Sequence, residues 1–364
     1  MEELDFSILD SVDKIGKNDW DDLFGDIPES YSFYKTLENS QLRGFSFFYL
    51  AVYQKKRVIF IAPLFSADFN IDIAVTGAAS KIINFIRKVF PRFLIFKSIF
   101  CGSAFGEYSV LGVKKLTGLD GLLPALLKGI EGLAGREGSK FIIFKDFLKE
   151  DTLFLDALKN YGFSKIESFP AVSVELGFSS FEEYLKSLGR STRKSLKKKL
   201  KLSSPEIEIK TTQDAKDYLD DIIALYENTY QVGKTRFEHL SRKFFEEASR
   251  QMHPHARFFL YFVNKKLAAF NLCFVYKDLL IDKFIGSDYD ISKRHNLYFL
   301  SWAYNVRWCI DNRLRFYYPG QTDYGPKLNL GGKLIPLFAY AKHRNKALNF
   351  MLRMFIPLLK PKQR

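Results

Sequence analysis

Short apolar runs alternate with helical patterns along the first half of the chain. Two β-rich runs, residues 45–54 and 57–65, flank Lys55 and Lys56 and predict a hairpin. The acidic first 43 residues predict a short strand at 6–9 and one or two helices. Further predicted helices cover residues 80–90, 119–135 and 151–162, and further predicted strands cover residues 107–113, 140–147 and 163–176. This alternation favours an α/β domain that extends to about residue 177.

The second half of the chain repeats this scheme. Its predicted helices cover residues 214–231, 241–251 and 296–312, and its predicted strands cover residues 207–210, 256–264, 266–276, 279–288, 314–320 and, after a Gly-rich turn at 329–333, residues 334–341. Both halves contain a hairpin, then a helix, then a strand. We therefore expect two duplicated α/β units with mixed (α+β) sheets, and one large mixed sheet is the alternative.

A long amphipathic helix is predicted between the two halves. Ser180 and Glu183 fit a capping box at its start, and Pro205 favours an end at residues 203–205. An apolar stripe runs along one side of this helix through Phe181, Leu185, Leu188, Leu196 and Leu200. The expected organisation is a domain at residues 1–177, a linker helix at 178–204, a second domain at 205–345 and a tail at 346–364.

The net charge of the 364-residue chain, +14, is concentrated in two segments. Residues 184–205 contain eight Lys or Arg and no acid, and residues 324–364 contain nine and no acid. The remaining residues carry a net charge of −3. Surface helices usually mix charge signs, so these blocks favour anions bound at defined places over a purely solvated face. They argue against a general coat for nucleic acid, and no DNA partner is expected.

Other features of the sequence exclude several classes of protein. Three scattered cysteines (Cys101, Cys273 and Cys309) cannot staple a secreted fold, and no CxxC pair is present. The longest uncharged run, residues 295–306, is shorter than the roughly 18 residues of a membrane-spanning helix. The acidic start is unlike a signal peptide. A soluble, cytoplasmic protein of two domains is therefore expected.

Four segments in a fixed order resemble a known family. They are SLGRSTRKSLKKKLK, FIGSDYD, YPGQTDYGPKLNLGGK and AYAKHRN. This order resembles the Fem-like, double-GNAT acyltransferases, a group that includes CelD-like acetyltransferases and peptidoglycan aminoacyl transferases. The resemblance covers most of residues 45–345 and is strongest at Arg190–Lys201 and Gly320–Lys327. It implies two GNAT-like domains, each a mixed sheet flanked by helices, joined by the basic helix, with the reaction in the C-terminal half.

The resemblance also implies acyl transfer to an amine or a hydroxyl. The donor would be an acyl-CoA cosubstrate or an aminoacyl ester, without a tightly bound cofactor or a metal. GNAT enzymes usually hold the donor pyrophosphate on a Gly-rich turn at a helix start, and this turn has no intact copy here. Lys293, Arg294 and the helix-starting amides near Asn296 are the candidate donor-binding groups instead.

Two carboxylates and one tyrosine are candidates for proton transfer. In the family, a carboxylate base often lies on the strand that matches residues 279–288, so Asp282 or Asp288 would deprotonate the acceptor. The alternative is that Asp282 faces solvent beside Lys283 and that Asp288 caps a turn. Tyr318 is a candidate general acid.

Lys327 follows a Gly-Pro turn near Gln321 and Tyr324. In the family, the matching lysine neutralises a developing oxyanion or a substrate phosphate, and Gln321 and Tyr324 would contact substrate. The alternative is a surface lysine in a basic tail. Arg193, Lys197 and Lys198 on the basic helix are the candidate contacts to an anionic substrate.

Three functions remain open at this stage. The first is transfer from an acyl-CoA thioester to a small-molecule or cell-envelope precursor, and the second is transfer from aminoacyl-tRNA to a peptidoglycan precursor. The third is a non-catalytic double-GNAT protein that binds membrane or envelope components. The tail at residues 346–364 would either pack on the body or contact an anionic membrane at its inner face. His253 and His255 flank a proline without nearby ligands, so a polar loop is expected there and no metal site.

Overall fold

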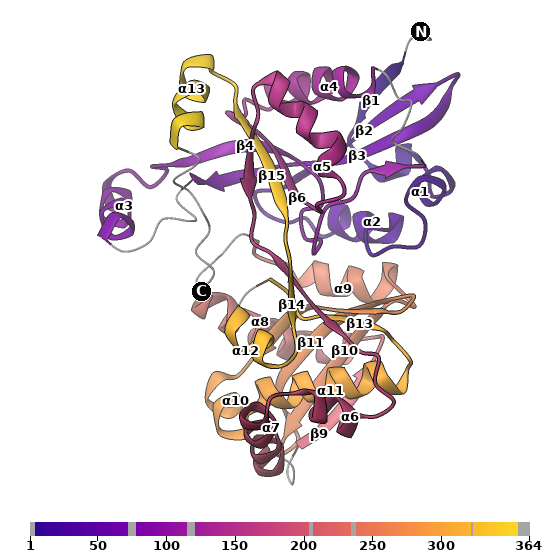
Figure 1. Cartoon of the computed structure of the whole chain (residues 1–364), viewed down its shortest axis with the longest axis vertical. Helices are drawn as coiled ribbons and strands as arrows, with labels where there is room; N and C mark the ends of the chain where they lie inside the picture. Colours follow the sequence, from indigo (N-terminus) through magenta and orange to yellow (C-terminus); the bar gives the residue numbers. More distant parts are fainter. Residues whose placement is uncertain are drawn as a thin grey trace. The chain divides into compact units, whose positions relative to one another are not determined.

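The computed structural model describes residues 4–71, 78–114, 121–203, 207–233, 238–321 and 323–355. The chain forms two compact units (Figure 1). Among the described residues, unit 1 extends over residues 4–38, 43–170 and 336–355, and unit 2 extends over residues 39–42 and 171–335. Each unit has its own mixed sheet, so the prediction of two α/β units is confirmed and the single large sheet is wrong.

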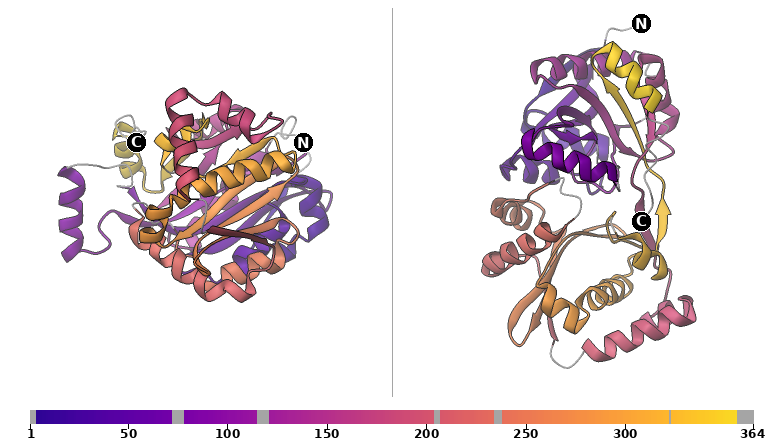
Figure 2. Two further views of the ribbon diagram at one scale, coloured as in Figure 1. Left: turned by 90° about the horizontal axis from the view of Figure 1, so that it is seen from below. Right: turned by 90° about the vertical axis from the view of Figure 1, so that its left-hand side faces the viewer.

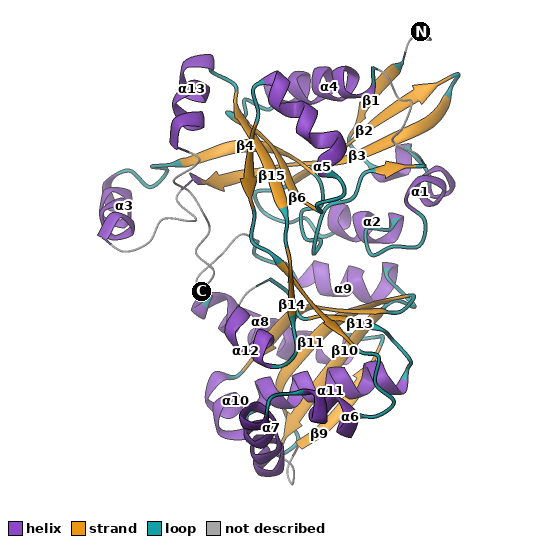
Figure 3. Ribbon diagram, in the orientation of Figure 1, coloured by secondary structure: helices purple, strands orange, loops and turns teal. Residues whose placement is uncertain are grey.

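Unit 1 is built on a sheet that is antiparallel except at one pair of strands. Its strand order is β1(Asp5–Leu9), β2(Ser46–Gln54), β3(Arg57–Asn70), β4(Ile95–Cys101), β6(Phe141–Phe147), β15(Phe338–His343) and β7(Ser164–Glu167), and β5(Gly112–Val113) pairs with β3. Only β4 and β6 are parallel among these neighbours. The helices of this unit are α1(Lys17–Phe24), α2(Tyr31–Asn39), α3(Ala78–Val89), α4(Leu122–Arg136), α5(Thr152–Leu155) and α13(Lys346–Phe355) (Figure 3).

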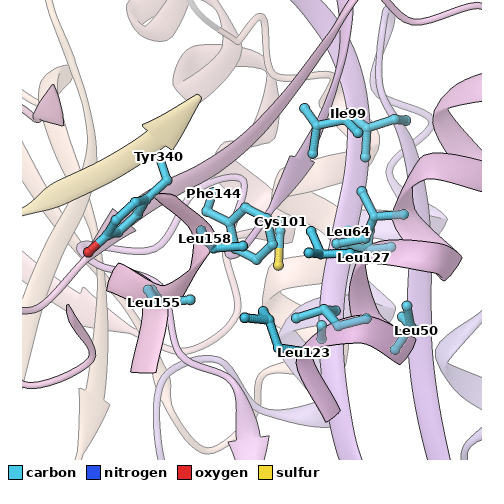
Figure 4. Packing of buried hydrophobic residues seen from close by; sticks show 14 of the residues in the cluster. Leu50, Leu64, Ile99, Cys101, Leu123, Leu127, Phe144, Leu155, Leu158 and Tyr340 are labelled. Carbon is cyan, nitrogen blue, oxygen red and sulfur yellow. The ribbon is translucent and has the colours of Figure 1, made fainter. Parts of the chain in front are cut away.

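Neighbouring side chains of β2 point to opposite faces of the unit 1 sheet, and a helix packs on each face. Leu50 packs with the Leu-rich side of α4 in an apolar cluster that also includes Cys101 and Phe144 (Figure 4). The next residue back, Tyr49, contacts Trp20 of α1 on the opposite face. The result is a sheet with an apolar core on the α4 side.

Unit 2 repeats the architecture of unit 1. Its strand order is β14(Lys333–Ile335), β8(Ala171–Glu175), β13(Phe316–Tyr318), β12(Leu279–Ser287), β11(Lys266–Tyr276), β10(Ala256–Val263) and β9(Ile207–Thr212). Its helices are α6(Phe181–Ser187), α7(Arg190–Ser203), α8(Leu219–Val232), α9(Arg242–Gln251), α10(Tyr289–His295), α11(Leu297–Asp311) and α12(Tyr324–Asn329) (Figure 2).

The two faces of the unit 2 sheet are covered by different helices. Phe270 of β11 packs against Phe245 of α9 on one face. Cys273 of the same strand joins an apolar cluster with α6, α7 and α11. Because side chains alternate along a strand, Asn271 and Cys273 share the face that α11 covers.

The two sheets have the same spatial order of strands and one parallel pair at the same place. They differ in one strand, which comes from the C-terminal part of the chain in unit 1 and from the middle of the chain in unit 2. β15, from the C-terminal part of the chain, lies between β6 and β7 in unit 1. β8, from the middle of the chain, lies between β13 and β14 in unit 2. The predicted strand at 334–341 is therefore two short strands, β14 and β15, in different sheets. The predicted domain boundaries at residues 177 and 345 differ accordingly from the observed ones.

Two local predictions also differ from the structure, and one strand has no prediction at all. The strand β4 was not predicted, and the predicted strand at 107–113 is reduced to β5. The predicted long helix is broken into α6 and α7 at Leu188, whose backbone is extended, and the helix restarts beyond Gly189. Both helices belong to unit 2, so they do not form a linker. Residues 204–206 lie outside the described residues, so the predicted helix end is confirmed only as far as Ser203.

Candidate active site

The parallel strands β12 and β13 of unit 2 pair over only three residues and then part. The last pair joins Ile281 to Tyr318, whereas β12 continues to Ser287. A β-bulge at the same place leaves Asp282 opposite Cys273 and Phe284 opposite Leu272. Bulges are common next to active sites because they change the direction of a side chain. Here the bulge lies beside Asp282, the first residue of β12 beyond the paired section.

The Asp282 carboxylate is surrounded by hydrogen-bond donors from three elements. Asn271 Nδ2 donates to both carboxylate oxygens at 2.8 Å. Asn305 Nδ2 of α11 and the Tyr317 hydroxyl of β13 each donate to Oδ2 at 3.0 Å. Asn305 Nδ2 also donates to the Tyr317 hydroxyl at 3.1 Å. The idea that Asp282 simply faces solvent is therefore wrong: the residue is half-buried, and its carboxylate is the centre of a polar network whose partners Asn271, Asn305 and Tyr317 are buried.

Burial and hydrogen bonding act in opposite directions on this carboxylate. Burial raises the pKa of Asp282, while the donors Asn271 and Tyr317 and the positive charge of Lys327 oppose the rise, and the net pKa lies above its ordinary value. Burial and the negative charge of Asp282 together raise the pKa of Tyr317 strongly. Tyr317 consequently keeps its proton and serves as a donor to Asp282.

Lys327 is held on the short helix α12, close to this network. Its side chain is 5% exposed, and its Nζ donates to the Gly320 carbonyl at 3.2 Å. Gly320 has φ +80°, a conformation that favours glycine, so the turn before α12 depends on it. Pro326 fits within the first turn of α12, where a backbone N–H has no helical partner. The interpretation of Lys327 as a surface lysine is wrong.

The C-terminal end of α12 is fixed from two directions. The Gly332 N–H donates to the Lys327 carbonyl at 2.9 Å, and a Cβ at Gly332 would lie 2.8 Å from that oxygen. The Tyr184 hydroxyl of α6 donates to the Leu330 carbonyl at 2.8 Å and accepts a bond from Trp302 of α11 at 2.9 Å. These contacts hold the backbone of Lys327 in place.

Three buried polar atoms around Asp282 have no hydrogen-bond partner within the described chain. They are Asn305 Oδ1, Tyr261 Oη and Tyr298 Oη. Burial and the charge of Asp282 contribute to raising the pKa of both tyrosines, which remain neutral. An unpaired buried acceptor or hydroxyl is costly, so such atoms are candidates for contact with a ligand.

The other predicted site residues near the β12–β13 split have mixed placements. Asp288 caps α10, where its carboxylate accepts from Ile291 N–H at 3.1 Å, as the capping alternative proposed. Tyr318 ends β13, directly after Tyr317. Gln321 is partly buried in the turn before α12, and Tyr324 is buried at the start of that helix.

The predicted donor-binding residues lie at the junction of α10 and α11. Lys293 and Arg294 are exposed in the last turn of α10. Asn296 has φ 51° and ψ 37° and lies directly before α11, whose start has no side-chain cap. The chain therefore brings two cations and a 15-residue helix start together after β12, the strand that carries Asp282.

Acidic side chains neutralise only part of the positive charge of the basic helix α7. Leu196 is buried, whereas Lys198 is exposed. Lys197 forms an ion pair with Glu182 at 2.9 Å, and Arg193 donates to the Lys186 carbonyl at 3.1 Å. Of the three predicted anion contacts, Lys197 is thus partly neutralised by an acid of α6.

A cavity of about 340 Å³ lies elsewhere in unit 2, beside the end of α7. Its lining includes Leu200, Lys201, Ile207, Leu300 and Arg307, but neither Asp282 nor Lys327. The candidate site is thus argued from the polar network rather than from this cavity. Among the described residues, no group of three or more His, Cys, Asp or Glu side chains is arranged to hold a metal ion.

Sequence reasoning identified Asp282 and Lys327 but not the groups around them. The missed residues are Asn271, Asn305, Tyr317, Tyr261 and Tyr298. A signal was present for the amides: Asn271 interrupts the apolar run 267–275, and Asn305 interrupts the apolar helix at 297–310. A buried side-chain amide needs hydrogen-bond partners, and both of these amides donate to the Asp282 carboxylate.

Comparison with known proteins identifies a family and a fold. Residues 119–351 match the model of the FemAB-like family, described as peptidoglycan biosynthesis/recognition. The crystal structure of FemX is similar, with a TM-score of 0.59 at 12% identity over 95% of this chain and 100% of that chain. A tandem GNAT protein from the clavulanic acid biosynthesis pathway has a TM-score of 0.54 at 11% identity over 94% and 99%. The two-domain GNAT fold is confirmed.

Two further similarities widen the comparison. The L-PGS structure from Bacillus licheniformis has a TM-score of 0.51 at 11% identity over 92% of this chain and 98% of that chain. A protein of Mycobacterium tuberculosis named as an 8-amino-7-oxononanoate synthase 2 is 26% identical over 321 residues, covering 86% of this chain. The chain spans 42% of the length of that relative. No helix among the described residues is long and apolar enough to cross a membrane.

Proposed function

The chain belongs to the FemAB-like family of peptidoglycan biosynthesis and recognition proteins, and on that premise we propose that it is an acyltransferase. Its reaction centre is the polar network of unit 2 around Asp282 and Lys327. The donor is a thioester of the acyl-CoA type, and the acceptor is an amine or hydroxyl of a small-molecule or cell-envelope precursor. The observation that carries this proposal is a buried lysine beside a carboxylate network that contains unpartnered polar atoms.

The proposed reaction forms one bond and breaks another. The acceptor nitrogen or oxygen attacks the thioester carbonyl carbon, negative charge gathers on the carbonyl oxygen, and the C–S bond then breaks. In the overall balance, the acceptor loses one proton and the released thiol gains one. The Lys327 ammonium stabilises the oxyanion, because a fixed cation in a water-poor site interacts strongly with developing charge. Tyr318 is the candidate acid that protonates the thiolate, and the proton that the acceptor loses then restores the Tyr318 hydroxyl.

Asp282 acts through its neighbours in this proposal. Four donor contacts from Asn271, Asn305 and Tyr317 occupy its oxygens, which leaves little capacity to receive the acceptor's proton. Its negative charge attracts the positive charge of Lys327, and its bond from Asn305 Nδ2 fixes the orientation of that amide. Asn305 Oδ1, Tyr261 and Tyr298 then face the acceptor, and Asn305 Oδ1 accepts a hydrogen bond from its amine or hydroxyl.

The donor's phosphates bind at the start of α11 in this proposal. The backbone N–H groups there are uncapped by a side chain, and Lys293 and Arg294 add positive charge next to them. Gln321 and Tyr324 border the acceptor side. CoA and charged tRNA are cytoplasmic donors, so we place the reaction in the cytoplasm.

The proposal is tested by a search for acceptor-dependent thiol release. Acetyl-CoA, succinyl-CoA and palmitoyl-CoA are each mixed with the protein and with small amines, amino sugars or an amine-bearing cell-wall peptide. We expect release with at least one pair, and a KM for the donor about tenfold higher in Lys293→Glu/Arg294→Glu. Lys277→Glu, an exposed lysine of the β11–β12 turn, is the control. Absence of acceptor-dependent release with every donor rejects the thioester proposal.

The basic helix favours a second candidate, transfer from aminoacyl-tRNA. Arg193 and Lys198 add positive charge to a helix without acidic residues. This candidate predicts tRNA binding that weakens steeply with salt and is lost in Arg193→Glu/Lys198→Glu, while Lys266→Glu binds normally. Unchanged binding in the double variant removes it. If the protein binds envelope components but transfers no acyl group from acyl-CoA or from aminoacyl-tRNA, the non-catalytic function is favoured.

A further inference from the structure

Helix α13 of unit 1 directs its apolar side chains away from the body of the unit. Phe350 is 66% exposed and Met354 is 63% exposed, while Leu348 and Met351 are each about half exposed. A surface helix of a globular protein normally turns its apolar stripe toward the core. The apolar stripe of α13 is instead available to a partner.

The side of α13 that faces the body is fastened by an amide. Asn349 is 9% exposed, and its Oδ1 accepts from the His343 N–H of β15 at 2.9 Å. Asn349 Nδ2 donates to the Gly162 carbonyl at 2.9 Å. Asn345 caps the helix by accepting from Leu348 N–H at 3.1 Å. These polar bonds fix the orientation of the helix, so the outward position of the apolar residues is built into the fold.

Helix α3 presents a second apolar group on the same side of unit 1 as α13. Phe85 and Val89 are each 69% exposed, and Phe90, directly after the helix, is 65% exposed. Figures 1 and 2 place α3 and α13 on this common side in all three views. Two separate segments of the chain, more than 250 residues apart, therefore form helices on one side of the unit, and both carry exposed large apolar residues.

Along the sequence, the charged neighbours of these apolar residues are all positive, and Arg92, just after α3, forms an ion pair with Asp68 at 2.9 Å. Arg87 and Lys88 lie in the last turn of α3, and Lys346 and Arg353 lie on α13. Residues 83–94 and 344–354 contain no Asp or Glu. Large apolar residues with basic neighbours suit the interface of an anionic bilayer. A second copy of this chain fits less well, because it would bring like charges together.

We propose that the outward faces of α3 and α13 form a surface that binds an anionic lipid bilayer. The apolar residues enter the interfacial region, and the cations meet the headgroups. This surface lies in unit 1, goes beyond the acyl transfer proposed for unit 2, and does not depend on it.

Vesicle binding by the whole chain tests this proposal. Vesicles of phosphatidylglycerol and phosphatidylcholine in equal parts are compared with vesicles of phosphatidylcholine alone in a sedimentation assay. We expect binding to the anionic vesicles that falls at least tenfold in Phe85→Ser/Phe90→Ser/Phe350→Ser/Met354→Ser. Leu153→Ser, which removes a side chain that is 91% exposed elsewhere in unit 1, is the matched control and should bind like the wild type.

Two readouts keep this test decisive. All four substituted residues are exposed, so the thermal unfolding midpoint should change little, and transfer to a soluble acceptor should be unchanged in the fourfold variant. No binding to anionic vesicles, or equal binding by the fourfold variant, overturns the proposal. A change in oligomeric state without a change in vesicle binding overturns it in favour of a second copy. Failure of acyl transfer in the wild type bears only on the function proposed for unit 2.

Discussion

Units 1 and 2 have the same order of strands, but different residues lie where the two parallel strands of each sheet stop pairing. In unit 1 the last pair of β4 and β6 joins Cys101 to Phe144, and both residues belong to an apolar core (Figure 4). In unit 2 the pair of β12 and β13 ends beside Asp282, which is surrounded by amides and Tyr317. One residue beyond the last pair, unit 1 continues with Gly102, and the following Ser103 N–H donates to the Ser109 hydroxyl, whereas unit 2 places a carboxylate there among amides and Tyr317. A fold therefore locates a site only together with the side chains placed on it.

The largest expected effect on stability comes from unit 1. Phe144→Ala removes a fully buried ring and should destabilise the protein by about 3–5 kcal/mol, measured by urea unfolding. Transfer activity per folded molecule should be unchanged, because unit 1 supplies packing rather than reacting groups. Leu153→Ala, at an exposed position, is the control, and its unfolding midpoint should match the wild type. An activity loss in folded Phe144→Ala would break the comparison.

Asp282→Asn should have a somewhat smaller effect on stability but a large effect on activity. The substitution removes the acceptor shared by Asn271, Asn305 and Tyr317, and we expect a loss of about 3 kcal/mol on urea unfolding. The rate of acyl transfer should fall because Lys327 and Asn305 lose the carboxylate that holds them in position. The exposed neighbour Asp278→Asn should leave both quantities unchanged. Wild-type stability in Asp282→Asn would mean that the network is not formed.

Tyr298→Phe separates a ligand contact from a structural role. Its hydroxyl is buried without a partner in the described chain, so its removal should not lower stability and could raise it by about 1 kcal/mol. If the hydroxyl contacts the acceptor, the acceptor KM should rise about tenfold while the donor KM stays constant. A loss of stability with unchanged KM would assign the hydroxyl a structural role instead.

The smallest effect concerns the acid sensitivity of unit 1. Burial opposes ionisation of Asp156, but hydrogen bonds from Lys159, Tyr340 and Lys165 outweigh it and lower its pKa well below the ordinary value. A lowered pKa means that the unfolded chain binds the proton more readily, so this stabilisation is present above about pH 4 and is lost as pH falls further. Asp156→Asn should therefore flatten the fall of the melting temperature in acid. An equally steep fall in Asp156→Asn would contradict this assignment.

Local patterns predicted most elements of both units. The alternating runs predicted the two hairpins and the three strands β10 to β12, and the long apolar runs predicted α4 and α11. The exchange of β15 and β8 between the sheets could not be predicted, because it depends on long-range pairing that periodicity does not report. The break at Gly189 was missed because the apolar stripe continues across it.

The sequence predicted two residues of the candidate site but not the residues around them. Lys327 and Asp282 stood out by residue type and resemblance. Their partners Asn271 and Asn305 lie 11 residues before and 23 residues after Asp282, and only the strand register, the bulge and the packing of α11 bring them together. The burial of Lys327 likewise depends on α12, a helix too short to show a period.

The most direct test of the reaction centre compares two lysine variants of the whole chain. Lys327→Met removes the buried cation of unit 2, and Lys333→Met removes an exposed lysine six residues later that pairs with Glu175. With a donor and acceptor pair that the wild type uses, kcat/KM should fall by about 100-fold or more in Lys327→Met and stay within about twofold in Lys333→Met. A folded Lys327→Met protein with the kcat/KM of the wild type would contradict the assignment of the reaction centre to unit 2.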